Sequence, residues 1–206
     1  SFKKVFAGLN GIEGILNGNI IELSSISQEE INNFKYTPSS GLGSCRYKMK
    51  KLEESTEEYD KLLEILKAND IKAFFYVGGN DSMDTTAKLS AYAKKTGIDV
   101  KFIGIPKTID NDLMYTDHTP GFGSAAKFIA TSVLETYLDS SVYINNGIFI
   151  LETMGRDTGW LASAAALAKL NGKQVADFIY LPETAFDIDK FLVDVKNKFE
   201  EQNQVY

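Results

Sequence analysis

The feature that most constrains the fold is the alternation of short apolar runs with longer segments of helical periodicity. Strands are expected at Val5–Ala7, Ala73–Val77, Val100–Ile105, Ile148–Leu151 and Phe178–Leu181. Helices are expected at Glu53–Asn69, Ser82–Lys95, Ser124–Tyr137, Trp160–Leu170 and Asp187–Glu200. Alternating strands and helices favour a parallel sheet that is covered by the connecting helices. The sequence therefore predicts an α/β fold, a parallel sheet with helices on both faces.

The sequence contains no feature that would mark a domain boundary inside its first 185 residues. The 206 residues contain no internal repeat, low-complexity tract or linker-like stretch. We therefore expect one compact α/β domain. We place that domain at residues 1–185 and expect residues 186–206 to begin the connection to a second domain.

Composition and charge exclude several classes of function. The formal net charge is −6, whereas a nucleic-acid-binding face is basic because it neutralises phosphates. No stretch of the sequence reaches the roughly 18 apolar residues of a membrane-spanning helix. Cys45 is the single cysteine, which excludes an internal disulfide and is typical of a reducing, cytoplasmic location.

Function is expected in the loops that follow the strands, because parallel sheets bind ligands at the carboxyl ends of their strands. The first such loop is Gly78-Gly79-Asn80-Asp81-Ser82. Glycines directly after a strand bring backbone N–H groups close to a phosphate, with a helix N-terminus behind them. The alternative is a plain strand-to-helix turn in which Asp81 or Ser82 is the N-cap.

The second loop is Pro106-Lys107-Thr108-Ile109-Asp110-Asn111-Asp112, which gathers carboxylates, a lysine and a hydroxyl. A carboxylate here would take a proton from an attacking hydroxyl, and the lysine would neutralise phosphate charge. The alternative is a solvated loop of Asx-turns. A calcium loop does not fit, because Met114 and Tyr115 stand where a ligand and a glycine should follow.

The third loop is Met154-Gly155-Arg156-Asp157-Thr158-Gly159-Trp160. An arginine in a glycine-flanked loop suits a bidentate phosphate contact. The alternative is a surface arginine paired with Asp157, with Trp160 packed in the core. Together, the three loops would place backbone donors, a base and an arginine at one edge of the sheet, which indicates phosphoryl transfer to a small molecule.

The order and spacing of these motifs resemble those of phosphofructokinases. The matching blocks are Gly78 to Ser82, Pro106 to Asp112, Gly121-Phe122 and Met154-Gly155-Arg156. The resemblance runs from about Gly11 to Ala185 and implies a phosphofructokinase-like, Rossmann-like three-layer fold with the second domain largely absent. It implies phosphorylation of the 1-hydroxyl of fructose 6-phosphate, a step of glycolysis, by a cytoplasmic homodimer or homotetramer that uses Mg²⁺.

The resemblance also implies a role for individual positions. Asp110 resembles the base that takes the proton of the sugar 1-hydroxyl, and Thr108 and Lys107 are assigned to catalysis beside it. The residues that resemble the fructose 6-phosphate site are Thr108, Asp110, Asp112, Met154, Gly155 and Arg156. The residues that resemble the donor site are Arg46, Gly78, Gly79, Asn80, Asp81, Ser82 and Lys107. The residues assigned to Mg²⁺ are Asn80, Asp81 and Asp112.

Two departures from the family pattern favour pyrophosphate as the phosphoryl donor. ATP-using members usually read Gly-Gly-Asp-Gly-Ser and Pro-Gly-Thr at the first two loops, whereas this chain has Asp81 and Lys107 in place of two glycines. The Asp81 carboxylate would repel the α-phosphate of a nucleotide, and Lys107 offers a cation to pyrophosphate. Asn80 replaces the usual metal-binding aspartate, so the contact to Mg²⁺ there is expected to be weaker or to pass through water.

Two alternative functions stay open on the sequence. One is an ATP-dependent 6-phosphofructokinase that tolerates Asp81 and Lys107. The other is a non-catalytic regulatory homologue that binds sugar phosphate without turning it over, although the presence of Asp110 favours an enzyme. Because family members begin before the matching residues and continue past them, we expect these 206 residues alone to be inactive.

Overall fold

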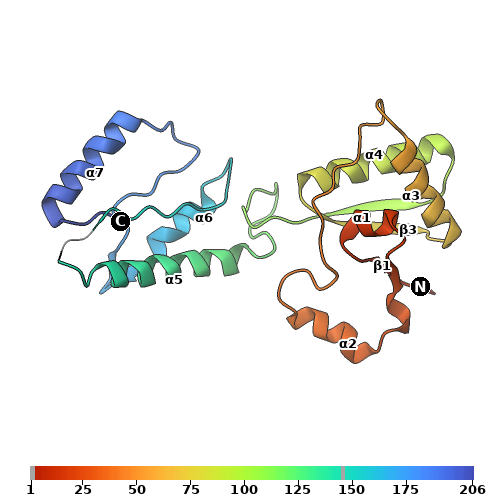
Figure 1. Ribbon diagram of the computed structural model, residues 1–206, viewed down its shortest axis with the longest axis horizontal. Coiled ribbons are helices and arrows are strands. Elements are labelled where there is room, and N and C mark those ends of the chain that lie inside the picture. The colour runs from red at the N-terminus through yellow and green to blue at the C-terminus, as the bar shows by residue number, and fades with distance from the viewer. Residues whose placement is uncertain (1–2, 145–146) are drawn as a thin grey trace. The chain divides into compact units, whose positions relative to one another are not determined.

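The computed structural model describes residues 3–144 and 147–206, and the chain divides into two compact units, residues 1–106 and 107–206 (Figure 1). This division differs from the predicted boundary after residue 185. The second unit begins after the parallel strands, and its first helix, α5 (Phe122–Ser140), packs against the helical segments at Trp160–Ser163 and Ala164–Leu167. The long helix α5 therefore joins the later part of the chain into a unit of its own.

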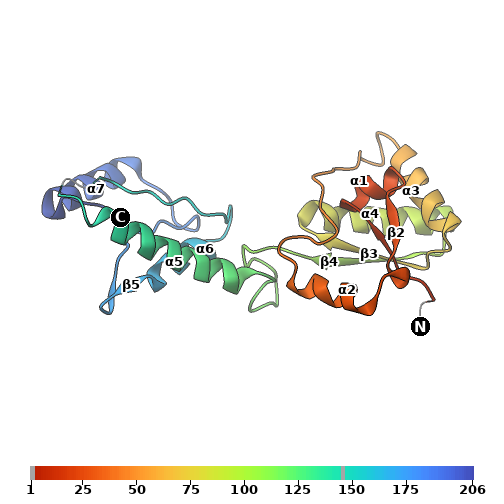
Figure 2. The same cartoon turned by 60° about the horizontal axis from the view of Figure 1, so that its bottom comes forward.

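The first unit contains one parallel and one antiparallel pair of strands (Figure 2). Its elements are β1 (Phe6–Gly8), α1 (Gly11–Leu16), β2 (Ile20–Glu22), η1 (Leu23–Ser25), α2 (Gln28–Asn33), η2 (Phe34–Tyr36), α3 (Glu57–Ala68), β3 (Ala73–Gly78), α4 (Asn80–Thr96) and β4 (Lys101–Pro106). β3 and β4 are parallel, with Phe74 opposite Phe102, whereas β1 and β2 are antiparallel. The predicted helices and strands at α3, β3, α4 and β4 are confirmed within a few residues, but the short elements between β1 and α3 were not predicted.

The core of the first unit lies between the helices and one face of the parallel pair. The apolar face of α3 is buried at Tyr59, Leu62, Leu63 and Leu66. Leu89 of α4 and Phe74 of β3 join the same cluster. The helical spacing that predicted α3 therefore also identifies its buried face.

The parallel pair is covered on one face within the described part of the chain. Gly104 of β4 faces α4 so closely that a Cβ there would lie 2.7 Å from Sδ of Met83. The alternate positions Phe75, Val77, Ile103 and Ile105 are 40–59% exposed. The predicted burial of these strands is therefore confirmed on the face toward α4. On the opposite face their apolar side chains are exposed.

We expect Leu89→Ala to destabilise the protein strongly, because the Leu89 side chain is fully buried. A leucine-to-alanine change in a core lowers the free energy of unfolding by about 2–5 kcal/mol. The matched control is Lys94→Ala on the exposed side of the same helix, with an expected change within about 0.5 kcal/mol. Denaturant unfolding of the full native protein, followed by circular dichroism, measures both values. Similar values for the two variants would contradict this description of the core.

The regular secondary structure described for the second unit is mostly helical. Its elements are α5 (Phe122–Ser140), α6 (Trp160–Ser163), η3 (Ala164–Leu167), β5 (Lys169–Leu170), β6 (Lys173–Gln174) and α7 (Ile188–Gln202). The prediction of one helix over 160–170 is wrong, because η3 ends at Leu167 and a hairpin follows. Asn171 and Gly172 both have positive φ, which a two-residue Asn-Gly hairpin turn requires. This turn outweighs the helical preference of the preceding alanines.

The predicted strands at Ile148–Leu151 and Phe178–Leu181 are also absent from the described structure. Ile148 makes an isolated parallel bridge to Val205, and the backbone N–H of Phe178 donates to the carbonyl of Tyr206. A strand requires hydrogen bonds to a neighbouring strand along its length. Among the residues described here, the segments 148–151 and 178–181 each bond to the end of the chain only through their first residues. Both predictions are therefore wrong for this part of the chain.

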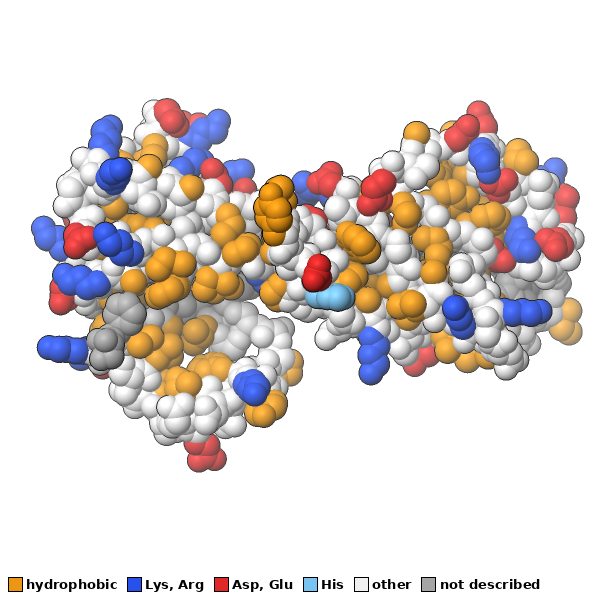
Figure 3. All heavy atoms as spheres, turned by 180° about the vertical axis from the view of Figure 1, so that it is seen from behind, with side chains coloured by type: hydrophobic (Ala, Val, Ile, Leu, Met, Phe, Trp, Pro, Cys, Tyr) orange, Lys and Arg blue, Asp and Glu red, His pale blue; other side chains and the backbone are white. Residues whose placement is uncertain are grey.

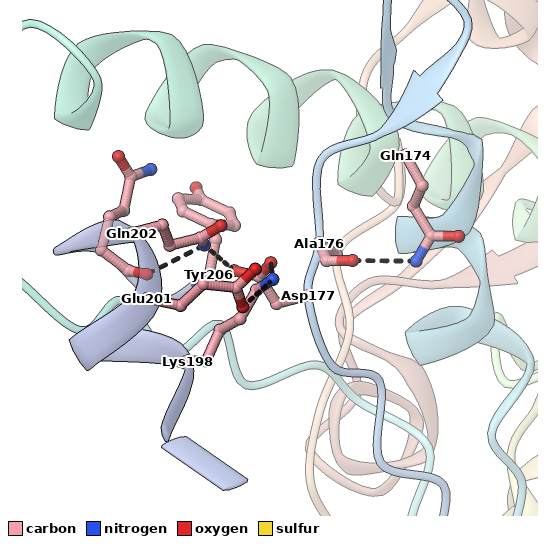
Figure 4. A network of polar contacts seen from close by, with 8 residues as sticks. Gln174, Ala176, Asp177, Lys198, Glu201, Gln202 and Tyr206 are labelled. Carbon is pink, nitrogen blue, oxygen red and sulfur yellow. Dashed lines mark hydrogen bonds and ion pairs between the residues drawn. The ribbon is translucent and has the colours of Figure 1, made fainter. Parts of the chain in front are cut away.

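The last residues are held in place by one carboxylate, as Figure 4 shows. Oδ2 of Asp177 accepts hydrogen bonds from Nε2 of Gln202 and from the backbone N–H of Tyr206, each at 3.0 Å. Nζ of Lys198 lies 3.8 Å from the other oxygen. The Tyr206 ring stacks on Phe149 at 4.7 Å between ring centroids. Burial raises the pKa of the Tyr206 hydroxyl to about 12, so this residue stays neutral in the core.

Neither described stretch, 3–144 or 147–206, contains a helix that is long and apolar enough to cross a bilayer.

Candidate active site

The first predicted loop lies in the first unit, where β3 passes into α4. Gly78 must be glycine, because a Cβ there would lie 2.2 Å from Oγ of Ser82. Gly79 is the N-cap of the 17-residue helix α4 and supplies no side-chain cap. The alternative in which Asp81 or Ser82 is the N-cap is therefore wrong. The first N–H groups of α4 have no side-chain cap at the N-cap position, which is the arrangement that binds anions.

The charges around this loop include a lysine that the sequence analysis missed. Asp81 lies in the first turn of α4, and its Oδ1 is 3.4 Å from Nζ of Lys48. Both side chains are largely exposed, as is that of Arg46. In the sequence, Lys48 is marked only by its position two residues after Arg46, which had been assigned to the donor site. Burial raises the pKa of Tyr76 on β3, and the Ser82 hydroxyl opposes that shift.

The second loop lies in the second unit and centres on Asp110. The backbone N–H of Asp110 donates to Oγ1 of Thr108 at 3.0 Å, and its carbonyl accepts from Oγ1 of Thr158 at 3.1 Å. The carboxylate oxygen Oδ1 of Asp110 is buried and has no hydrogen-bond partner among the described residues. A buried polar atom without a partner is costly and uncommon in folded proteins. This oxygen is therefore the clearest functional feature of the loop.

The next residue, Asn111, holds the far end of the same loop. Asn111 is buried and has a left-handed backbone with φ of 60°. Its Oδ1 accepts the backbone N–H of Thr119 at 2.9 Å. The bond spans eight residues, so the alternative of a local Asx-turn at Asn111 is wrong. The contact instead fixes the base of the loop from Asn111 to Thr119.

The third loop exposes its arginine. Gly155 has φ of 112°, and a Cβ there would lie 2.4 Å from the carbonyl oxygen of Thr158, so glycine is required. Arg156 is exposed and makes no ion pair within residues 3–144 and 147–206. Trp160 is 54% exposed and contacts the edge of Phe122. The alternative with Arg156 paired to Asp157 and Trp160 in the core is therefore wrong.

Glu183 is a further residue that the sequence analysis missed. Its Oε1 accepts the backbone N–H of Gly159 at 2.7 Å, and a Cβ on Gly159 would lie 2.8 Å from Oε2. Glu183 follows Pro182 after the apolar run Phe178–Leu181. The sequence does carry a signal for Glu183, a carboxylate shortly after an apolar run, which is the pattern that singled out the second loop.

The structure thus brings together part of the predicted site. The bond between Thr158 and Asp110 joins the second and third loops within the second unit. Lys107, Asp112 and Arg156 are exposed there and make no ion pair in the described part of the chain. The first loop and Arg46 belong to the first unit. The predicted site residues therefore fall into two groups: the first loop and Arg46 in the first unit, and the second and third loops in the second unit.

The residues assigned to Mg²⁺ are divided in the same way. Asn80 and Asp81 lie in the first unit and Asp112 in the second. All three are exposed. No group of three or more His, Cys, Asp or Glu side chains suited to a metal ion occurs among the described residues.

Comparison with known proteins identifies the family. The model of the phosphofructokinase family matches residues 2–206. The chain belongs to the phosphofructokinase family. It is 48% identical over 199 residues to pyrophosphate–fructose 6-phosphate 1-phosphotransferase of Xanthomonas campestris pv. campestris (strain B100), covering 96% of this chain and 48% of that relative. The protein of the same name in Methylococcus capsulatus (strain ATCC 33009 / NCIMB 11132 / Bath) is 46% identical over 196 residues, covering 94% and 47%.

A solved structure supports the same fold. The pyrophosphate-dependent phosphofructokinase from Nitrosospira multiformis has a TM-score of 0.86 and 41% sequence identity, covering 99% of this phosphofructokinase chain and 51% of that one. The predicted α/β, phosphofructokinase-like fold class and the family resemblance are therefore confirmed. The chain spans about half the length of the curated relatives it matches.

Proposed function

We propose that the full native protein transfers a phosphoryl group from pyrophosphate to the 1-hydroxyl of fructose 6-phosphate and produces fructose 1,6-bisphosphate. The observation that carries the proposal is the buried, unpartnered Oδ1 of Asp110 within the family motif. A carboxylate oxygen that is free of other donors is suited to accept the proton of a bound hydroxyl. Relatives at 46–48% identity are named for this reaction, which supports the choice of acceptor and donor.

The proposed step needs little covalent participation from the protein. Asp110 takes the proton of the 1-hydroxyl, that oxygen bonds to a phosphorus of pyrophosphate, and the bond to the bridging oxygen breaks to release phosphate. Lys107 and Arg156 have no ion-pair partner in the described chain, so their charges are available to phosphate groups. Thr108 adds a hydroxyl directly after Lys107 in the chain, and Met154 and Gly155 complete the sugar-binding loop in this proposal.

Pyrophosphate is favoured over ATP by charges at the two loops. Asp81 is exposed at the start of α4 and would face the α-phosphate of a nucleotide, which repels it. Pyrophosphate has no such group. The cations Lys48 and Arg46 of the first unit and Lys107 of the second loop would attract its charges. Gly78, Gly79 and Ser82 form the turn that would place backbone donors against the transferred phosphate.

Mg²⁺ is part of the proposal, and the assigned residues fit it chemically. Asn80, Asp81 and Asp112 offer exposed side-chain oxygens, and Mg²⁺ is usually held by one or two carboxylates together with substrate phosphates and water. When bound, the ion would neutralise charge on the phosphoryl oxygens.

Assembly and location complete the proposal. A homodimer or homotetramer is supported by the exposure of large apolar side chains in both units, which Figure 3 shows as orange surface areas. Exposed apolar patches mark sites of contact with other polypeptide surfaces. A cytoplasmic location is supported by the single cysteine, Cys45.

A coupled assay on the full native protein with fructose 6-phosphate and Mg²⁺ tests the function directly. We expect kcat/KM with pyrophosphate to exceed that with ATP by about 100-fold or more, since like-charge juxtaposition costs several kcal/mol. Turnover with ATP alone would contradict the donor assignment. Turnover with neither donor would favour the non-catalytic homologue.

A further inference from the structure

The backbone of Asp110 is fixed by side chains instead of by a helix or a sheet. Its N–H group donates to Thr108, two residues before it, and its carbonyl accepts from Thr158, 48 residues after it. The contact to Thr108 is local and belongs to the same loop. The contact from Thr158 therefore ties the Asp110 backbone to a distant part of the chain.

Thr158 is itself held in a closed turn. Its carbonyl oxygen lies 2.4 Å from the position that a Cβ of Gly155 would take, and the N–H of the next residue, Gly159, donates to the carboxylate of Glu183. The backbone on both sides of the Thr158 side chain is thus constrained. A hydroxyl on so constrained a backbone can determine the position of the carbonyl that it contacts.

We propose that Thr158 is a positioning residue for Asp110. Its hydroxyl holds the Asp110 carbonyl, and this contact fixes the backbone that carries the unpartnered Oδ1 to the loop that follows Met154, Gly155 and Arg156. The proposal rests on the proposed function, because it assumes that Asp110 is the base. A base must lie within hydrogen-bond reach of the proton it takes, and a displacement of about 1 Å can cost about 100-fold in rate.

The test compares substitutions that differ in the hydroxyl group. In the full native protein with pyrophosphate, fructose 6-phosphate and Mg²⁺, we expect Thr158→Val and Thr158→Ala to lower kcat about 10- to 100-fold. The KM for fructose 6-phosphate is expected to change less than kcat. Thr158→Ser keeps the hydroxyl and is expected to stay within about threefold of the wild type. Thermal unfolding of each variant shows whether it folds, and Thr158→Ala adds no bulk should valine disturb the turn.

Two further comparisons separate positioning from a general structural effect. Thr136→Val is the matched control, because Oγ1 of Thr136 also donates to a backbone carbonyl in the second unit, that of Ser132 within α5. Its kcat is expected to stay within about twofold of the wild type. In an Asp110→Asn background, Thr158→Val is expected to cause less than about a twofold further loss, because residues that act as a unit are non-additive.

The outcomes bear separately on the two proposals. Absence of turnover by the wild type with either donor would overturn the proposed function and, with it, the role of Thr158. If the wild type turns over, kcat of Thr158→Ala within twofold of the wild type would overturn the positioning role alone. A loss in Thr158→Ser as large as in Thr158→Val, or an undiminished loss in the Asp110→Asn background, would do the same.

Discussion

Asp110→Asn is expected to lower kcat with pyrophosphate about 100- to 10,000-fold, the usual contribution of a general base. Asparagine keeps the shape of the side chain and the backbone contacts to Thr108 and Thr158, but its amide cannot take the proton of the sugar hydroxyl. The KM for fructose 6-phosphate is expected to change little, because the loss is confined to the transition state. Steady-state kinetics on the full native protein give both values.

The control for this variant is Asp117→Asn in the same loop. Asp117 is exposed, so its change removes a carboxylate without touching the contacts that hold Asp110. We expect kcat of Asp117→Asn to stay within about twofold of the wild type. A similar small effect in Asp110→Asn would show that another group takes the proton, and the buried, unpartnered Oδ1 would then need a different explanation.

The sequence predicted the elements of the fold that periodicity or a long apolar run can reveal. The helix α3 was predicted because its apolar residues recur at helical spacing, and β3 because it is a continuous apolar run. The helix α2 is six residues long, too short for periodicity to be seen, although Ser27 and Glu30 form a capping box that the sequence displays. The Asn171-Gly172 turn was also visible, and it should have outweighed the alanine-rich run before it.

The sequence predicted those residues of the candidate site that stand close together in one continuous motif. Glycine at Gly78 and Gly155 and the cluster around Asp110 stand in continuous motifs, so their residue types alone indicated phosphate binding and proton transfer. The contacts from Thr158 to Asp110 and from Glu183 to Gly159 span 48 and 24 residues. Such contacts depend on how the second unit folds, and no spacing rule in a single sequence predicts them.

Exchanging the two donor-discriminating residues for the glycines of ATP-using members is expected to reverse part of the donor preference. Lys107→Gly should lower kcat/KM with pyrophosphate about 10- to 100-fold, because a hydrogen bond to a charged group contributes about 1.5–3 kcal/mol. Asp81→Gly should raise kcat/KM with ATP, because it removes the charge that repels a nucleotide. The double variant should combine both changes, and the measurement is kcat/KM with each donor.

The Asp81→Gly variant is expected to stay folded, and α4 offers a matched control for it. Asp81 is lost at little cost in stability, because its pair with Lys48 is exposed and such pairs contribute about 0–1 kcal/mol. Asp84→Asn removes an exposed carboxylate further along α4 and is expected to leave the ratio of the two donor constants within about twofold. If Asp81→Gly and Asp84→Asn shift that ratio equally, local repulsion at the first loop does not determine the donor. Donor choice would then have to come from residues other than Asp81.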